Sequence, residues 1–388
     1  MSGIYLVAAE ASGDELAAEF IDAVRAVRPD MAFFGVGGAA MAERGVPSLL
    51  DISDLSIVGL FDGVKIFKLL RRRVEETAED VVAKSPDAVV LVDSWGFTSR
   101  VAEQMKAIGA PGIPIKLVGP QVWATRPGRV KRLADTVDHV LCIHAFETPF
   151  YEPYGLPTTV IGNPAVSRAQ LGDGAGFRAR NGVAADAKLV GLLLGSRGAE
   201  LRRVAPTLEA AAVKLCEGHP DRKVLCVAAP SVADAVKERS RDWRFPFILS
   251  TAPDEKSDAF NAMDMALSCS GTVTTELALQ NTPMIVAYKI GWFSWALARA
   301  FLMKSKYITL LNVAAGAEIA PEFVQTRMTI DLVSDAGEKL LSSQGAAQTQ
   351  IDAQNAALEA MGRGRRPAAE IAAETVLQLI AYRADIGG

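Results

Sequence analysis

The sequence predicts an α/β protein built from two doubly wound, Rossmann-like domains. The chain has 388 residues, and at roughly 150 residues per domain this length allows two or three domains. Half of the residues are hydrophobic, which is enough material for more than one core. Short apolar runs alternate with longer amphipathic segments, and this alternation is typical of βαβ units in a parallel sheet.

The first half contains five apolar runs of the length expected for buried strands. Each run is followed by a segment with the apolar spacing of a helix, so we expect helices on both faces of a parallel sheet. The predicted strands are residues 4–9, 32–36, 88–92, 115–118 and 137–143.

A glycine-rich stretch with little apolar periodicity separates this series from a second one. The second series predicts strands at residues 189–194, 224–228, 247–250, 265–268 and 284–287. We therefore expect an N-terminal domain at 1–165, a second domain at 166–345, and a helical tail at 346–388 that packs back across the junction. Open α/β sheets bind ligands beyond the carboxyl ends of their strands, so the active site is expected in a cleft between the domains.

The composition argues against several classes of protein. The chain has 41 Lys and Arg residues against 45 Asp and Glu residues, so it lacks the basic excess of a general nucleic-acid binder. The four cysteines and three histidines show neither a disulfide framework nor the spacing of metal ligands. The chain begins without a secretory signal and has no apolar stretch that could span a bilayer. We expect a cytoplasmic protein that is soluble or bound to the membrane surface.

Polar residues follow two of the predicted strands in the first half. Glu10, Ser12 and Asp14 lie in AEASGD, a strand-to-helix turn of small residues whose helix amides favour an anion or a polar sugar group. Alternatively, Ser12 or Asp14 simply caps the helix. Asp93 ends a strongly apolar strand, where a partly desolvated carboxylate can serve as a general base. Capping of the next helix is again the alternative.

Two turns in the second half have the composition of phosphate sites. In LLLGSRGAEL a serine opens a helix and an arginine offers a fork of donors, although a plain surface arginine is the alternative. In CSGTVTTELAL a helix opens on small residues, and a glutamate one turn further in can hold both hydroxyls of a ribose. Together the two helix starts indicate a nucleotide site, made of Gly195, Ser196 and Arg197 with Ser270, Gly271, Thr272 and Glu276.

Residues 58–73 combine apolar bulk with five cations. The pattern fits a core helix with a solvated basic face, and it equally fits an interfacial helix on an anionic lipid surface. In the second case the membrane or acyl contacts are Leu60, Phe61, Val64, Phe67, Arg71 and Arg72.

Twelve segments, taken in order from about residue 4 to 325, resemble the lipid-A-disaccharide synthase family. They are AEASGD, GVGGAAM, SIVGLFDGV, the strand-end Asp93, GPQVWATRPGRVKR, FETPFY, IGNP, LLLGSRGAE, SGTVTTELAL, PMIVAYK, ITLLNVAAG and PEFVQ.

This resemblance implies an inverting glycosyltransferase of the two-domain GT-B type. The implied reaction joins UDP-2,3-diacylglucosamine to 2,3-diacylglucosamine 1-phosphate, forming the β-1,6-linked disaccharide of lipid A and releasing UDP. The implied partners are these two substrates and the anionic inner face of the cytoplasmic membrane, with a homodimer through the C-terminal tail as a further expectation and no nucleic acid. No DxD motif lies at a suitable strand end, so no metal or other cofactor is expected.

The resemblance also implies roles for single residues. Asp93 falls on the carboxylate regarded as essential, Arg197 on the arginine of the Gly-Ser-Arg turn and Glu276 on the ribose-binding acid. Asn312 and Gln325 fall on polar residues near the nucleotide, and Glu10, Ser12 and Asp14 on the amino-terminal motif that lines the cleft. The implied catalytic residues are Asp93 as the base, with Glu10 and Arg197.

The chain departs from the family pattern around the expected acceptor site and hinge. Where the family shows Asp-Phe-Asn, this chain has Gly96, Phe97 and Thr98. Other departures are Leu194, Asn163 and Thr125. The alternatives are another sugar-nucleotide GT-B enzyme, such as an epimerase or a transferase with a different lipid acceptor, and a non-catalytic membrane-bound sugar-nucleotide sensor. The retained Asp93 argues against the sensor, which has no need of a base.

Overall fold

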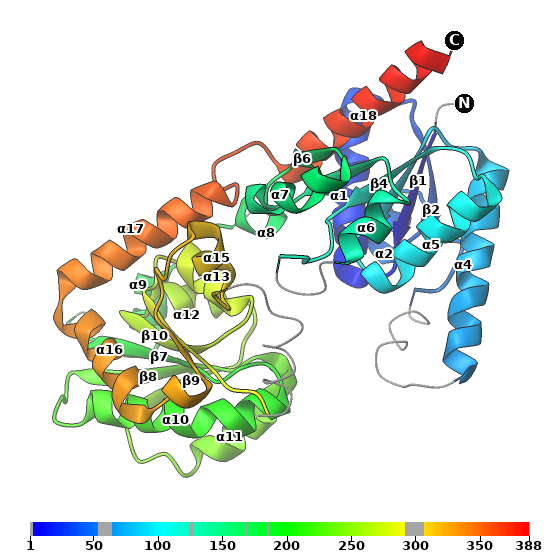
Figure 1. The fold of residues 1–388 in the computed structure, drawn as a ribbon. Helices are drawn as coiled ribbons and strands as arrows, with labels where there is room; N and C mark the ends of the chain where they lie inside the picture. The colour runs from blue at the N-terminus through cyan, green and yellow to red at the C-terminus, as the bar shows by residue number, and fades with distance from the viewer. Residues whose placement is uncertain are drawn as a thin grey trace. The chain divides into compact units, whose positions relative to one another are not determined.

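The computed structural model describes residues 3–52, 64–123, 128–167, 169–184, 186–291 and 306–387. The chain divides into two compact units (Figure 1). Unit 1 comprises Met1–Ser167 and Gly362–Gly388, and unit 2 comprises Arg168–Met361.

Unit 1 is a six-stranded parallel sheet in the order β2-β1-β3-β4-β5-β6. Its strands are β1 (Gly3–Ala8), β2 (Ala32–Val36), β3 (Ala88–Val92), β4 (Ile113–Leu117), β5 (His139–Cys142) and β6 (Thr158–Val160). Its α-helices are α1 (Ala11–Val27), α2 (Ala39–Glu43), α4 (Val64–Lys84), α5 (Trp95–Ile108), α6 (Arg129–Ala134), α7 (Thr148–Tyr151), α8 (Pro164–Ser167) and α18 (Ala368–Gly387). The 3₁₀ turns η2 (Ala145–Glu147) and η3 (Glu152–Tyr154) flank α7.

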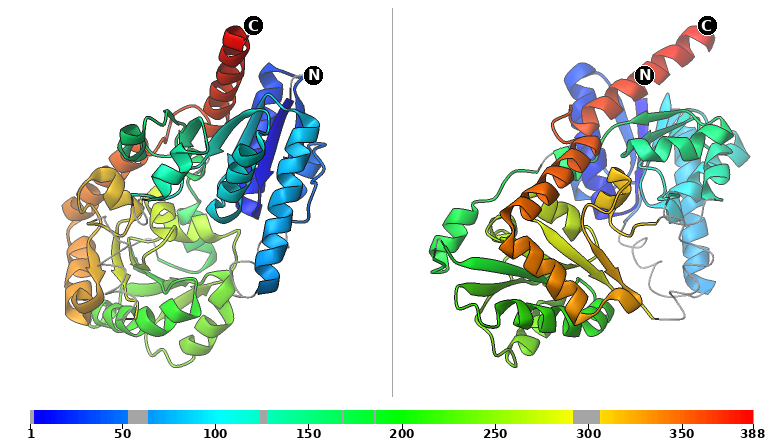
Figure 2. Two further views of the ribbon diagram at one scale, coloured as in Figure 1. Left: turned by 45° about the vertical axis from the view of Figure 1, so that its right-hand side comes forward. Right: turned by 60° about the vertical axis from the view of Figure 1, so that its left-hand side comes forward.

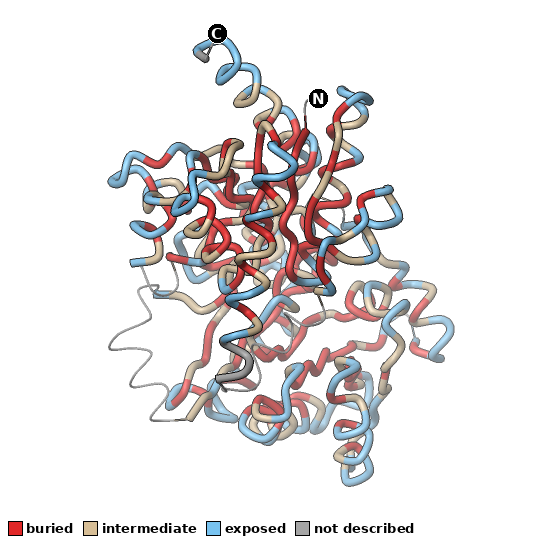
Figure 3. Tube along the Cα trace, turned by 90° about the vertical axis from the view of Figure 1, so that its right-hand side faces the viewer, coloured by how far each residue is buried: buried red, intermediate tan, exposed pale blue. Residues whose placement is uncertain are grey.

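The two faces of this sheet bury alternate residues of each strand. In β1, Ile4 and Leu6 pack with α1 and α18 on one face, whereas Tyr5 and Val7 pack with α4 and α5 on the other. Both sets are fully buried, which explains why the strand is a continuous apolar run. Figure 3 shows the resulting buried strands beside the exposed end of α18.

Unit 2 is also a six-stranded parallel sheet, in the order β12-β11-β10-β7-β8-β9. Its strands are β7 (Lys188–Leu193), β8 (Arg222–Val227), β9 (Phe247–Ser250), β10 (Met265–Cys269), β11 (Met284–Tyr288) and β12 (Glu322–Val324). Its α-helices are α9 (Gly174–Arg180), α10 (Gly198–Cys216), α11 (Ala233–Ser240), α12 (Lys256–Asn261), α13 (Val273–Leu279), α15 (Leu310–Ala315), α16 (Ile330–Ser342) and α17 (Gln344–Ala360), with 3₁₀ turns at η4 (Pro230–Val232) and η6 (Gln325–Arg327). Helices α10 and α16 cover one face, where Val190 and Leu192 of β7 meet Leu208 and Leu340.

The sequence-based fold class is confirmed, and each of the ten predicted strands overlaps an observed one. Two edge strands, β6 and β12, were missed because each has only three residues and carries polar side chains. The segment predicted as a helical tail at 346–388 contains two helices that pack in different units. Helix α17 packs on α15 and α13 in unit 2, whereas α18 packs on α1 in unit 1 (Figure 2).

No helix within the described ranges is both long and apolar enough to cross a membrane.

Docking of α18 makes a testable contribution to unit 1. Val376 is fully buried against α1, so Val376→Asp places a carboxylate in the core and should lower the free energy of unfolding by roughly 2 to 5 kcal/mol. The matched control is Tyr382→Asp, because Tyr382 lies on the same helix with 65% of its surface exposed. Urea denaturation followed by circular dichroism and fluorescence measures both variants. Equal stability of the two variants would show that α18 adds nothing to the core.

Candidate functional site

The first candidate site lies where the strand order of unit 1 reverses. Strands β1 and β3 are parallel neighbours, with Ala8 opposite Val92, while the chain continues to β2 on one side and to β4 on the other. Ligands of doubly wound sheets bind at such a switch point, beyond the carboxyl ends of the strands. Glu10 follows β1 and Asp93 follows β3, so the pairing brings both predicted acids to one edge. The Ser94 hydroxyl links them by donating to Oε1 of Glu10 at 2.8 Å.

The backbone that carries Asp93 is held in an unusual conformation. Asp93 and Ser94 have φ angles of +40° and +34°, a left-handed region that costs a residue with a side chain roughly 1 to 2 kcal/mol. The Asp93 amide donates to the carbonyl of Leu117 at 2.9 Å, and the Thr98 hydroxyl lies 2.8 Å from the Asp93 carbonyl oxygen. These bonds fix the turn and therefore the direction of the half-buried Asp93 side chain.

Lys116 of β4 is buried next to this turn and forms hydrogen bonds with it. Its Nζ donates to the carbonyl oxygen of Asp93 and, at 2.8 Å, to the Thr98 hydroxyl. Burial lowers the pKa of Lys116 to about 7, although the charges of Asp93 and Glu10 act in the opposite direction. Sequence reasoning missed this residue. The available signal was a lysine inside the apolar run IPIKLV.

Two other predicted residues of this edge have different surroundings. Ser12 is exposed in the first turn of α1. Asp14 is buried, and its carboxylate accepts hydrogen bonds from the amides of Gly38, Ala40 and Met41 at 2.7 to 3.2 Å. Asp14 therefore holds the start of α2, a capping role on a helix other than its own.

The second candidate site lies at the corresponding reversal in unit 2, between β7 and β10. Leu193 is paired with Ser268, so the Gly-Ser-Arg turn and the Ser-Gly-Thr turn follow adjacent strand ends. A glycine is required at Gly195, because its φ is +97° and an added Cβ would lie 2.8 Å from the Glu200 side chain. The structure thus brings the two predicted turns together.

Glu200 organises the first turn. Its Oε2 accepts from the Ser196 amide at 3.0 Å, and its Oε1 lies 3.1 Å from the guanidinium of Arg197. Only 11% of the Glu200 side chain is exposed, against 79% for Arg197. Arg197 is therefore presented to solvent at the start of α10 while the Ser196 amide is already engaged. Sequence reasoning missed Glu200, although a glutamate three residues after a helix cap is a known capping signal.

The second turn is open on one side. No heavy atom lies within 4 Å of the position that a Cβ on Gly271 would occupy, and Gly271 and Thr272 are exposed beside Ser270. Glu276 is paired with Lys256, whose Nζ lies 2.5 Å from its Oε2, and the two side chains are about two-fifths exposed.

The last two predicted nucleotide residues lie deeper. Asn312 is fully buried and saturated: its Nδ2 donates to the Ala320 carbonyl and to Glu322, and its Oδ1 accepts from the amides of Ile319 and Ala320. It supports the loop and offers no group to a ligand in this arrangement. Gln325 directly follows β12, has a φ of +54° and donates to the Ile290 carbonyl at 3.3 Å.

The predicted membrane segment is described only in part. Leu60 and Phe61 lie outside the described residues, as do the side chains of Val64 and Phe67 in α4. Arg71 and Arg72 are exposed and pair with Glu75 and Glu76 at 2.8 and 2.7 Å. On the other face of α4, Leu70 is buried, as are Val74, Ala78 and Val81 beyond the predicted segment. In the described part of this segment Leu70 is thus a core residue, and Arg71 and Arg72 lie on a charged face with acidic partners.

Comparison with known proteins identifies the family. Residues 4–376 match the family described as lipid-A-disaccharide synthetase. The chain belongs to that family. It is 38% identical to the lipid-A-disaccharide synthase of Rhodospirillum centenum, with 98% of this chain and 95% of the relative covered. The corresponding figures for the enzyme of Paramagnetospirillum magneticum are 36%, 97% and 97%.

Solved structures share the GT-B fold at low identity. The UDP-GlcNAc 2-epimerase of Neisseria meningitidis, solved with UDP-GlcNAc, has a TM-score of 0.61 at 12% identity and covers 97% of this chain and all of that one. MurG of Acinetobacter baumannii has a TM-score of 0.56 at 12% identity with the same coverage. These likenesses confirm the predicted fold. The family match over residues 4–376 shows which of the enzyme families with this fold the chain belongs to.

Lys116 gives the first site a measurable pH dependence. In the unfolded chain its pKa is that of an ordinary lysine, so between about pH 7 and 10 the unfolded state binds more protons and the folded state gains stability as pH rises. Replacing it by methionine should remove this gain, so the stability of wild type relative to Lys116→Met should rise by about 1.4 kcal/mol per pH unit over that range. Urea denaturation at pH 6, 7, 8 and 9 measures the difference. A difference that stays constant across this series would contradict a depressed pKa.

Proposed function

We propose that the chain transfers 2,3-diacylglucosamine from UDP-2,3-diacylglucosamine to 2,3-diacylglucosamine 1-phosphate, forming a β-1,6-linked disaccharide 1-phosphate and UDP in lipid A biosynthesis. The observation that carries this proposal is the family match over residues 4–376. Epimerases share the fold at 12% identity only, so they provide no comparable support.

Unit 1 supplies the base in this proposal. Inverting transfer needs a carboxylate that removes the proton from the acceptor 6-hydroxyl as its oxygen attacks the anomeric carbon. Asp93 meets this need because it lies at the switch point on a turn that Lys116 and Thr98 hold in place. Glu10 adds a second negative charge beside it and, through Ser94, helps to orient the same turn.

Unit 2 holds the UDP of the donor. The exposed guanidinium of Arg197 offers paired donors to the diphosphate, and the open side of Gly271 leaves room for it. When the donor binds, the Glu276 carboxylate accepts hydrogen bonds from the ribose hydroxyls in place of its ion pair with Lys256. The remaining residues of the UDP site are Ser196, Thr272 and Gln325. Asn312 acts indirectly, by holding the loop that contains Ile319 and Ala320.

The chemistry proposed here uses only the chain's own residues. Within the described ranges no three His, Cys, Asp or Glu side chains are grouped to hold a metal ion. The acyl chains of both substrates place the reaction at the cytoplasmic face of the inner membrane, so a peripheral association with anionic lipid belongs to this proposal. A homodimer through the C-terminal helices stays a prediction.

The proposed base is tested by Asp93→Asn. Removing the acid while keeping the shape should leave UDP binding and stability unchanged, and kcat for disaccharide formation should fall by roughly 10² to 10⁴. Mass spectrometry of the product from the two acylated precursors measures the rate. Asp138→Asn, on an exposed position of unit 1, is the matched control. If the Asn variant keeps more than about a tenth of the wild-type rate, Asp93 is only a cap or a positioning group.

The proposed diphosphate contact is tested by Arg197→Ala. Loss of a hydrogen bond between charged groups should weaken UDP binding by about 1.5 to 3 kcal/mol, measured by calorimetry. Arg241→Ala is the control, because Arg241 is also exposed on unit 2 and also pairs with a glutamate three residues away. Wild-type affinity in Arg197→Ala places the diphosphate elsewhere.

A further inference from the structure

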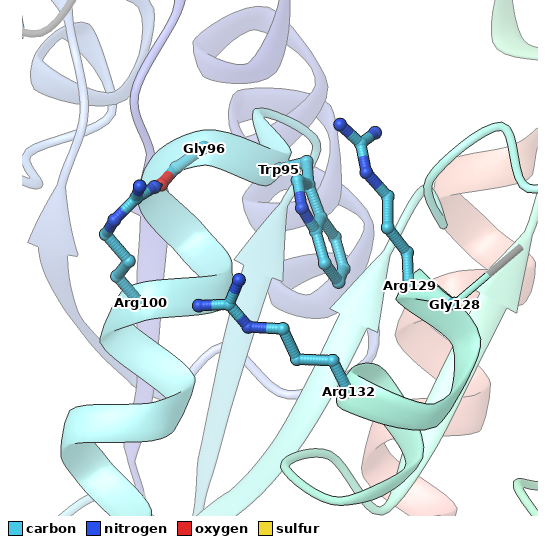
Figure 4. Close-up of a pocket in the computed structure, with 6 residues that line it drawn as sticks. All are labelled: Trp95, Gly96, Arg100, Gly128, Arg129 and Arg132. Atoms are coloured by element: carbon cyan, nitrogen blue, oxygen red, sulfur yellow. The ribbon is translucent and has the colours of Figure 1, made fainter. Parts of the chain in front are cut away.

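A pocket of about 520 Å³ opens at the start of α5 in unit 1. It is lined by Trp95, Gly96 and Arg100 from α5 and by Gly128, Arg129 and Arg132 from the start of α6 (Figure 4). Half of these residues are arginines and none is acidic. The composition therefore selects for an anion.

Packing around the pocket orients the three guanidinium groups. Arg129 lies over the Trp95 ring, 5.4 Å from its centre, and Arg100 donates to the carbonyl of Gly96 in its own helix. Arg132 is held by Glu103, whose two carboxylate oxygens accept from Nε and Nη2 along one edge of the guanidinium. In Figure 4 Arg132 extends from α6 toward α5, Arg100 runs along α5 to Gly96, and the indole stands between Arg132 and Arg129.

The start of α5 adds to the positive potential. Helix amino termini carry a partial positive charge, and a side-chain cap normally satisfies their amides. The N-cap residue here, Ser94, makes no such cap, because its hydroxyl is turned to Glu10. The pocket thus combines an uncapped end of a 14-residue helix with three arginines.

The pocket adjoins the proposed base along the chain. Trp95 is two residues beyond Asp93, and two residues span at most about 7 Å. In the acceptor, a single pyranose ring separates the attacking 6-hydroxyl from the oxygen at C1. A group attached at C1 is therefore within reach of the pocket while the 6-hydroxyl is at Asp93.

We propose that this pocket binds the 1-phosphate of the acceptor, with the indole of Trp95 as an apolar platform beside the sugar. The inference rests on the proposed function, and it names the residues that select the phosphorylated acceptor. Arginine forks match phosphate oxygens better than any other side chain. Gly96 leaves room in the pocket, because no heavy atom lies within 4 Å of the position that a Cβ there would occupy.

The test is equilibrium binding of 2,3-diacylglucosamine with and without its 1-phosphate, in zwitterionic detergent micelles. Wild type should prefer the phosphorylated form. Arg100→Gln and Arg129→Gln should each reduce that preference roughly tenfold or more, because each loses a charged donor, and the double variant should abolish it. Arg28→Gln, an arginine of unit 1 paired with Asp30 outside the pocket, should keep the wild-type preference. Far-UV circular dichroism and urea denaturation report that unit 1 is folded in each variant, because all three substitutions lie in that unit.

The outcomes separate the possible sources of phosphate. If the preference for the phosphorylated acceptor is unchanged in the double variant, the proposal is wrong. It is equally wrong if the variants lose binding to vesicles containing phosphatidylglycerol while that preference persists, because the pocket then holds a membrane headgroup. Disaccharide formation is measured separately. If the arginine variants lose the preference but the wild-type protein forms no disaccharide, the pocket is supported and the proposed function is contradicted.

Discussion

The parallel pairing of β1 with β3 and of β7 with β10 is the constraint on which both candidate sites depend. Each pair spans the point where strand order reverses, so the two following loops diverge to opposite faces and leave an opening at the sheet edge. The registers that set Ala8 opposite Val92 and Leu193 opposite Ser268 decide which residues meet there. A register shift by one residue would turn every side chain of a strand to the other face and separate these residues.

Each site has a buried ionisable side chain next to its turn, a lysine beside the acid of unit 1 and a glutamate beside the arginine of unit 2. In unit 1 the turn presents the acid Asp93, and Nζ of Lys116 donates a hydrogen bond to the Asp93 carbonyl oxygen. In unit 2 the turn presents the cation Arg197, and the Glu200 carboxylate pairs with it and accepts a hydrogen bond from the Ser196 amide. Burying either side chain in its charged form is costly without such partners. The cost is offset only while the turn keeps its shape, so the buried side chain couples the fold of each unit to the geometry of its site.

The sequence predicts the sheets well because buried parallel strands are apolar throughout, as β3 and β10 illustrate. It misses β6 and β12, since an edge strand of three residues has no period to detect. It predicts which segments form the sites but not how each side chain is used. Asp14, Asn312 and Lys116 show why: their roles follow from partners 24, 10 and 23 residues away, and hydrogen bonds over such separations leave no local pattern.

The most direct test of the account is the product that the wild-type protein forms from UDP-2,3-diacylglucosamine and 2,3-diacylglucosamine 1-phosphate. The proton couplings at the new anomeric carbon report its configuration, and nucleotide analysis counts the UDP released. The account predicts a β-1,6-linked disaccharide 1-phosphate and one UDP for each linkage. An epimerised UDP-sugar, or UDP released without a disaccharide, would contradict it.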